Sequence, residues 1–185
     1  MKRLWGIPLI LVLFTGCLGD NDQLDRAMAL RADLLCHDCA FNAEITADYG
    51  DELYTFGVRC EGDSEGNLGF EVTSPETIAG IQGSTSHDTG KLIFADTALE
   101  FPLMADNQIT PVSAPYLLLK TLRGGYVRSV GEENELLRVT IDDSYEEDAL
   151  QLDIWLNGEN LPVRAEILYD GCRILTMEVR DFQIL

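Results

Sequence analysis

The sequence is short of the residues on which most enzymes and nucleic-acid-binding proteins depend. It has two histidines, and 13 lysines and arginines against 32 aspartates and glutamates, for a formal net charge of −19. So acidic a chain repels the phosphate backbone, which argues against DNA or RNA as a partner. The sequence has neither a G-x-S-x-G motif, which would supply a nucleophile, nor an H-E-x-x-H motif, which would supply metal ligands and a base. We therefore expect no catalytic residues.

Signals for a metal or a cofactor are equally scarce. Cys36 and Cys39 have the C-x-x-C spacing, but no second pair follows to complete a zinc site. As a redox motif the pair lacks the βαβ pattern of thioredoxin-like proteins. The acidic runs 142–143 and 146–148 lack the D-x-[DN]-x-[DN]-G pattern of a calcium loop and read as solvated surface. We therefore expect neither metal nor cofactor.

Only one long apolar run is present, and it stands at the N-terminus. Two basic residues precede an almost wholly apolar stretch from Leu4 to Phe14, and Thr15-Gly16-Cys17 follows. A stretch too short to cross a bilayer comfortably, ending in small residues before a cysteine, is typical of a bacterial lipoprotein signal. We expect residues 1–16 to be removed and Cys17 to be acylated, with an ordinary secretory signal as the alternative. The protein would then be held by lipid alone at the extracytoplasmic face of the cell membrane.

The remaining chain has the size of one domain, with residues 17–23 as a polar tether and 24–185 as the domain. Residues 111–125 predict a short helix so apolar that it must be enclosed. Ser113 is expected to cap this helix, and Arg123 lies at its negative end. Spaced apolar residues predict another helix at 22–35.

Alternating apolar and polar residues predict about ten strands around the central helix, among them 77–82 and 91–94 joined by a polar loop at 83–90. The order helix, strands, helix, strands is typical of an α+β protein. We predict a single antiparallel sheet curved into an open half-barrel, lidded by the N-terminal and central helices.

The first hairpin predicts a disulfide. If Tyr49-Gly50 are its two loop residues, Ile45 faces Tyr54 and Cys39 faces Cys60, and the apolar residues share one face. Because thiols outside the cytoplasm tend to be oxidised, we expect Cys39 and Cys60 to be joined, with a Cys36–Cys39 redox pair as the alternative.

The register of the last hairpin determines where Cys172, the fifth cysteine, lies. A register that sets Ile167 against Leu175 and Ala165 against Met177 keeps apolar residues together and requires a three-residue loop. Cys172 would then lie at an exposed loop tip as a free thiol.

Two segments resemble the LolA/LolB-like lipoprotein-carrier family. PVSAPYLLL at 111–119 is similar to its proline-and-leucine helix, and LPVRAEILYDG at 161–171, followed by 175–182, resembles its late hairpin. The sequence looks closest to uncharacterised lipoproteins of clostridia-like Gram-positive bacteria, and is more distantly similar to the germination lipoprotein of spore formers. The resemblance implies an open β-barrel whose concave face is lidded by helices. Two departures are that the soluble carrier is not lipid-anchored, and that no counterpart of its lid-controlling arginine can be assigned.

This resemblance gives the concave face a functional interpretation. Its apolar residues are either core beneath the central helix or the lining of a cavity for an acyl chain or another hydrophobe, and patterning does not separate the two. The residues expected there are Phe41, Ile45, Tyr54, Phe56, Val58, Phe70, Tyr116, Leu118, Leu122, Leu152 and Ile154.

Two functional hypotheses follow, with an enzyme a distant third. The first is a lipid-anchored, non-enzymatic extracytoplasmic protein that holds a lipid or another hydrophobic ligand in its half-barrel. The second is a cell-envelope or spore-associated interaction module that docks a partner protein and has a filled core. The second follows from the germination lipoprotein, which works through a partner amidase.

Overall fold

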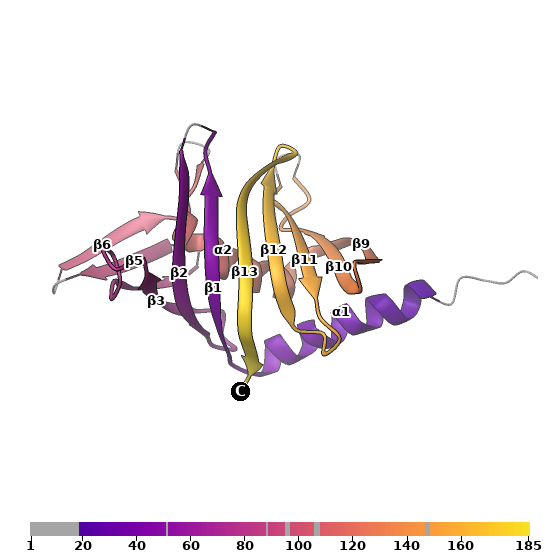
Figure 1. Ribbon diagram of the computed structural model, residues 1–185. Helices are drawn as coiled ribbons and strands as arrows, with labels where there is room; N and C mark the ends of the chain where they lie inside the picture. Colours follow the sequence, from indigo (N-terminus) through magenta and orange to yellow (C-terminus); the bar gives the residue numbers. More distant parts are fainter. Residues whose placement is uncertain (1–18, 51, 88, 95–96, 106–107, 147–148) are drawn as a thin grey trace, which may run out of the picture.

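The structure is a computed structural model and describes residues 19–50, 52–87, 89–94, 97–105, 108–146 and 149–185 (Figure 1). Cys17, the expected lipidation site, lies outside these residues. No helix within them is both long enough and apolar enough to cross a membrane.

Two α-helices and one large antiparallel sheet make up the described chain, so the predicted α+β half-barrel is confirmed. The helices are α1 (Gly19–Cys36) and α2 (Ala114–Gly124), the latter entered through the 3₁₀ turn η1 (Pro111–Ser113). The strands are β1 (Cys39–Asp48), β2 (Leu53–Gly62), β3 (Leu68–Ser74), β4 (Gln82–Ser86), β5 (Thr89–Phe94), β6 (Thr97–Pro102), β7 (Met104–Ala105), β8 (Gln108–Ile109), β9 (Tyr126–Glu133), β10 (Leu136–Asp142), β11 (Gln151–Leu156), β12 (Pro162–Tyr169) and β13 (Cys172–Ile184).

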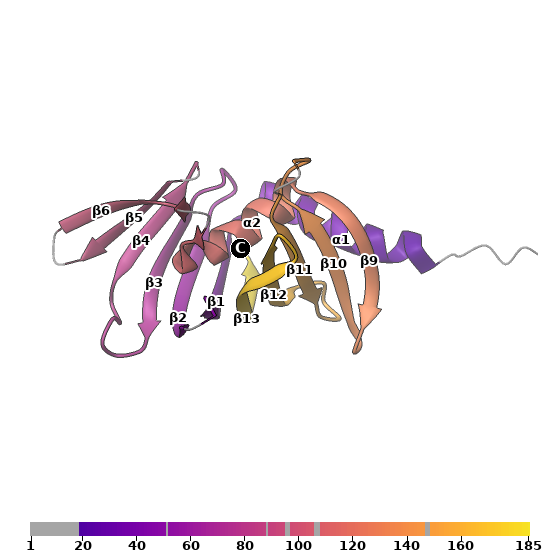
Figure 2. The same cartoon turned by 90° about the horizontal axis from the view of Figure 1, so that it is seen from above.

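Eleven strands form the sheet, in the order β6-β5-β4-β3-β2-β1-β13-β12-β11-β10-β9, while β7 and β8 pair separately. Figure 2 shows the sheet bent around α2, which lies on its concave side. In both views β5 and β6 extend away from α2, toward the end opposite the start of α1. We call β4, β5 and β6 the arm.

The register predicted for the first hairpin is wrong by two residues. Ile45 lies opposite Phe56 rather than Tyr54, and Cys39 lies opposite Gly62 rather than Cys60. Tyr49 is a paired residue rather than a turn residue, because its N–H donates to the carbonyl of Glu52 at 3.1 Å. The Tyr49 hydroxyl also donates to the carbonyl of Ile109 at 2.6 Å. Because the slip is an even number, every side chain keeps its predicted face.

The last hairpin confirms the predicted pairing of Ile167 with Leu175. The extra residue is a bulge after Ile167, and the turn itself has two residues, Asp170 and Gly171, both at positive φ. Cys172 is therefore the first residue of β13 rather than part of a loop tip, but it is exposed as predicted.

Three other predictions also needed correction. Residues 77–80 form a turn in which the N–H groups of Ile78 and Ala79 donate to the carbonyl of Pro75. The strand is 82–86, of which all but the first residue lie in the predicted loop. Helix α1 already begins at Gly19, within the segment assigned to the tether. Ser113 makes no capping bond through its side chain, because η1 leads directly into α2.

Helix α2 is enclosed as its composition predicts. Eight of its residues are buried against the inward-facing side chains of the sheet and against α1, and they are Ala114, Pro115, Tyr116, Leu117, Leu118, Leu119, Thr121 and Leu122.

Candidate functional site

The residues predicted to line a cavity are packed into the core beneath α2. Ten of the eleven are buried in one continuous apolar cluster, and the exception is Tyr54, which is 49% exposed at the end of β2. Five surface depressions in the described part of the chain have volumes between about 170 and 440 Å³, and none of these five is lined by a residue of α2. These ten side chains thus pack together as core, and Tyr116, Leu118 and Leu122 among them belong to α2 itself.

The concave face continues beyond α2 onto the arm, where it becomes open. One cross-strand row runs Phe70, Gly83, Leu92, Leu99 from β3 to the edge strand β6, and all four face inward. Phe70 is buried and Leu92 half-buried, whereas Leu99 is 63% exposed. Phe94, two residues beyond Leu92 on the same face, is 65% exposed. Apolar surface therefore passes from the core to the solvent without a break.

Two glycines of the arm leave room for aromatic rings on its inner face. A Cβ on Gly83 would lie 2.3 Å from Cζ of Phe70, and one on Gly90 would lie 2.1 Å from Cζ of Phe101. Each aromatic ring thus lies across a glycine of the neighbouring strand. Thr85, between them, is fully buried and its hydroxyl has no hydrogen-bond partner in the described residues. A segment that is polar in sequence therefore has an apolar inner face, because rings from adjacent strands cover it.

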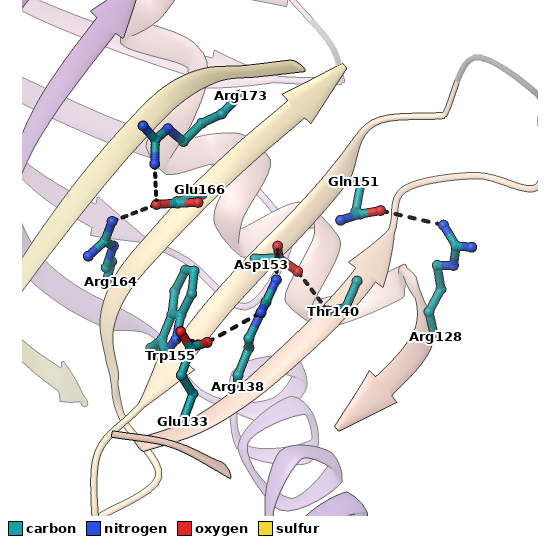
Figure 3. Close-up of polar contacts among 10 residues, drawn as sticks. All are labelled: Arg128, Glu133, Arg138, Thr140, Gln151, Asp153, Trp155, Arg164, Glu166 and Arg173. Carbon is teal, nitrogen blue, oxygen red and sulfur yellow. Dashed lines mark hydrogen bonds and ion pairs between the residues drawn. The ribbon is translucent and has the colours of Figure 1, made fainter. Parts of the chain in front are cut away.

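The opposite, convex face carries a polar cluster that the sequence did not reveal (Figure 3). The Trp155 ring lies between two guanidinium groups, with Cζ of Arg138 5.3 Å and Cζ of Arg164 5.2 Å from its centroid. Cation–π contacts of this kind are favourable at distances up to about 6 Å. The Trp155 indole N–H donates to the Glu133 carboxylate at 3.1 Å.

Asp153 lies at the base of this cluster and is almost wholly buried. Its carboxylate accepts hydrogen bonds from Arg138 Nη2 and from the Thr140 hydroxyl, both at 2.6 Å. The bond to Asp153 raises the pKa of Arg138.

Glu166 is held in a similar way by Arg164 at 2.5 Å and Arg173 at 3.0 Å. The cluster cross-links β9 to β13, so we interpret it as structural. In sequence these residues look like the ordinary outward positions of strands, and only the cross-strand register brings them together.

The cysteines occupy two environments. Cys39 and Cys60 are buried on the inner face and are free thiols in the structure, so the directly opposed pair that predicted a disulfide does not exist. Burial raises the pKa of both thiols, although nearby Arg123 opposes the shift at Cys39. Cys36 and Cys172 are exposed. Within the described residues, no cluster of three or more His, Cys, Asp or Glu side chains could hold a metal ion.

Comparison with known proteins finds fold-level likenesses only. No protein-family model matches the chain, and no curated protein matches it. An uncharacterised conserved protein from Thermus thermophilus is 14% identical, with a TM-score of 0.47 over 89% of this chain and 86% of that chain. A LolA superfamily protein from Nitrosomonas europaea is 11% identical, with a TM-score of 0.41 over 90% and 93%. The lipoprotein LppX from Mycobacterium tuberculosis is 9% identical, with a TM-score of 0.41 over 87% and 93%.

At these identities and TM-scores no function transfers from the matched proteins. The resemblance to clostridial lipoproteins stays a prediction. The function must be argued from this chain's own residues.

Proposed function

We propose that this protein is a lipid-anchored, non-enzymatic binding protein at the extracytoplasmic face of the membrane, and that its ligand is a lipid acyl chain or a similar hydrophobe. The sequence predicted a ligand in the core beneath α2. We instead propose that the ligand binds to the inner face of the arm. The observation that carries the proposal is the exposure of Phe94 and Leu99 on an apolar surface continuous with the core.

The small number of charges on the arm supports a ligand that binds through an apolar chain. Residues 77–104 contain three acidic residues and one basic residue, in a chain that has 32 acidic and 13 basic residues in 185. An exposed apolar surface in so acidic a protein is costly in water, and such surfaces commonly mark binding sites. A flexible chain laid along the row from Leu92 to Leu99 would cover it.

The test uses a chain expressed without residues 1–17 and a fluorescent fatty acid, cis-parinaric acid, as the probe. Phe94→Ser and Leu99→Ser remove apolar contact, and each should weaken binding by roughly tenfold, since ~1.4 kcal/mol of lost burial changes affinity by that factor. Ile93→Ser is the matched control, because Ile93 is 44% exposed on the outer face of the same strand. Probe binding that is absent, or equally weakened by all three substitutions, would refute the proposal.

The filled core under α2 favours a second candidate, the envelope interaction module. A photoreactive amino acid in place of Leu99, incorporated into the full chain in cells, separates the two. Cross-linking to a lipid supports the first function, and cross-linking to one protein species supports the second.

A further inference from the structure

Helix α1 has two apolar sides, and only one of them is used by the fold. Ala27, Leu30 and Leu34 are buried, and they attach the helix to the rest of the domain. A second apolar set is between 39% and 53% exposed, and it consists of Leu24, Met28 and Leu35. At 100° per residue this second set falls within an arc of about 40°, so it forms one stripe along the helix. We call it the α1 stripe.

Over residues 22–36, the acidic side chains of α1 lie away from this stripe. Asp22, Asp25 and Asp33 are exposed and lie roughly 80–160° around the helix from the centre of the stripe. Arg31 borders the stripe, but its guanidinium group is bonded to carbonyls at the end of α2. From Asp22 to Cys36, the exposed surface of α1 is thus divided into an apolar stripe and an acidic side, as in helices that lie in a membrane interface.

The length of chain before α1 indicates what covers the stripe. Only Leu18 separates Cys17 from Gly19, where the helix begins. If Cys17 is acylated, as the proposed function requires, the first helical residue lies within about 7 Å of the anchored residue, since an extended chain spans at most ~3.6 Å per residue. Figure 1 shows the start of α1 projecting beyond the sheet. A helix joined to the membrane by so short a connection brings its exposed apolar side to the lipid surface.

We propose that α1 lies along the membrane surface, with Leu24, Met28 and Leu35 inserted at the level of the lipid headgroups. This inference rests on the proposed lipid anchor and adds a second, non-covalent contact to it. The acidic side of α1 then faces water. Without residues 1–16 the chain has 11 basic and 32 acidic residues, so the contact is favoured by zwitterionic lipid and weakened by anionic lipid.

The chain allows a direct measurement of this contact with single tryptophans. Removal of residues 1–16 also removes Trp5, which leaves the buried Trp155 as the only native tryptophan. Met28→Trp places a reporter on the stripe. Ala29→Trp is the matched control, because Ala29 is exposed on the same turn but faces about 120° away from the centre of the stripe.

Acylated mature protein, residues 17–185, would be reconstituted into phosphatidylcholine vesicles that contain brominated phosphatidylcholine. We expect bromine to quench the Met28→Trp emission at least twofold more than that of Ala29→Trp or of the unsubstituted protein. Replacing one third of the lipid by phosphatidylglycerol should reduce the difference. Circular dichroism spectra and melting temperatures that match the unsubstituted protein would show that both variants are folded.

The outcomes separate this inference from the proposal on which it rests. Intact-mass analysis of the purified protein reports acylation independently of quenching. Acylated protein with equal quenching at positions 28 and 29 would overturn the membrane contact and leave the anchor intact. An unacylated product would overturn the anchor, and the contact with it. A second variant, Leu24→Glu in the Met28→Trp chain, should abolish the extra quenching without releasing the protein from the vesicles.

Discussion

Arg31 of α1 donates its Nε to the carbonyl of Leu122 in the last turn of α2, at 2.6 Å. Its Nη2 also donates to the carbonyl of Gly125 at 2.8 Å. The relationship is reciprocal, because Arg123 of α2 donates its Nε to the carbonyl of Leu34, in the last turn of α1, at 3.0 Å. Each helix thus has its carboxyl end closed by a cation from the other, which satisfies unpaired carbonyls and complements the helix dipole.

The first prediction concerns this pair of caps. Arg31→Met removes a charged donor from two carbonyls, so we expect it to lower the free energy of unfolding by about 1.5–3 kcal/mol. The measurement is urea denaturation followed by circular dichroism. Arg59→Met is the control, because Arg59 is 62% exposed and its ion pair to Glu71 spans 3.9 Å. An exposed pair of this kind contributes about 0–1 kcal/mol, so equal losses in the two variants would contradict the capping role.

The second prediction tests whether the lidded half is filled. Leu118 on α2 is fully buried, and Leu118→Ala should cost about 2–5 kcal/mol because it leaves a cavity in close-packed surroundings. Leu99→Ala on the arm should change stability by less than ~0.5 kcal/mol, since surface substitutions usually have such small effects. Similar losses for the two variants would show that the concave face is uniform rather than divided into a core and an open surface.

The third prediction concerns the buried carboxylate on the convex face. Arg138→Met leaves Asp153 buried with Thr140 alone and should cost about 1–3 kcal/mol. The double variant Arg138→Met/Asp153→Leu should recover part of this loss, because no buried charge remains unpaired. Arg128→Met on the same face is the control, since Arg128 is largely exposed. A double variant less stable than the single one would mean that Asp153 contributes through contacts other than the ion pair.

The fourth prediction concerns the thiols. In the native protein at pH 8, iodoacetamide should modify Cys172 and Cys36, while Cys39 and Cys60 should be protected by burial. Because burial raises the pKa of the two buried thiols, thiolate formation favours the unfolded state, and these thiols should lower stability as the pH rises above about 8.5.

Denaturation without reductant then tests the disulfide that the sequence predicted. If Cys39 and Cys60 become reactive, the bond is absent. If they stay unreactive and their peptides remain linked, the bond forms between diagonal rather than opposed positions. Modification of Cys60 in the native state would contradict the buried position itself.

Alternation along the chain was enough to predict the fold class, the central helix and the face on which each side chain of the first hairpin lies. It did not predict the register there, because Tyr49 was assigned to the turn, whereas its N–H pairs with the carbonyl of Glu52 and its hydroxyl binds a carbonyl sixty residues later. Strand β4 was missed for a similar reason. Its inner positions are Gly83 and Thr85, and the apolar cover comes from Phe70, which lies on another strand.

The same limit applied to the candidate site. Ten of the predicted lining residues are buried in the core, seven from the sheet and three from α2, but whether a cavity remains between them depends on how α2 packs, which no local pattern encodes. The exposure of Leu99 follows from the position of β6 at the edge of the sheet, and therefore from strand order. Strand order is a property of the whole chain.

The sheet is completed by pairing β1, its first strand in the chain, with β13, its last. Residues such as Ile45 and Met177 meet across this seam, while the strands on either side of it are joined mainly to their sequence neighbours. Until β13 is made, β1 and β12 each present an unpaired edge. Strands so distant in sequence pair slowly. We therefore expect the two halves of the sheet to form first, and the pairing of β1 with β13 to limit the folding rate. A chain that emerges outside the cytoplasm would pass through this interval with its β-edges exposed, when it is most vulnerable to proteases and to aggregation.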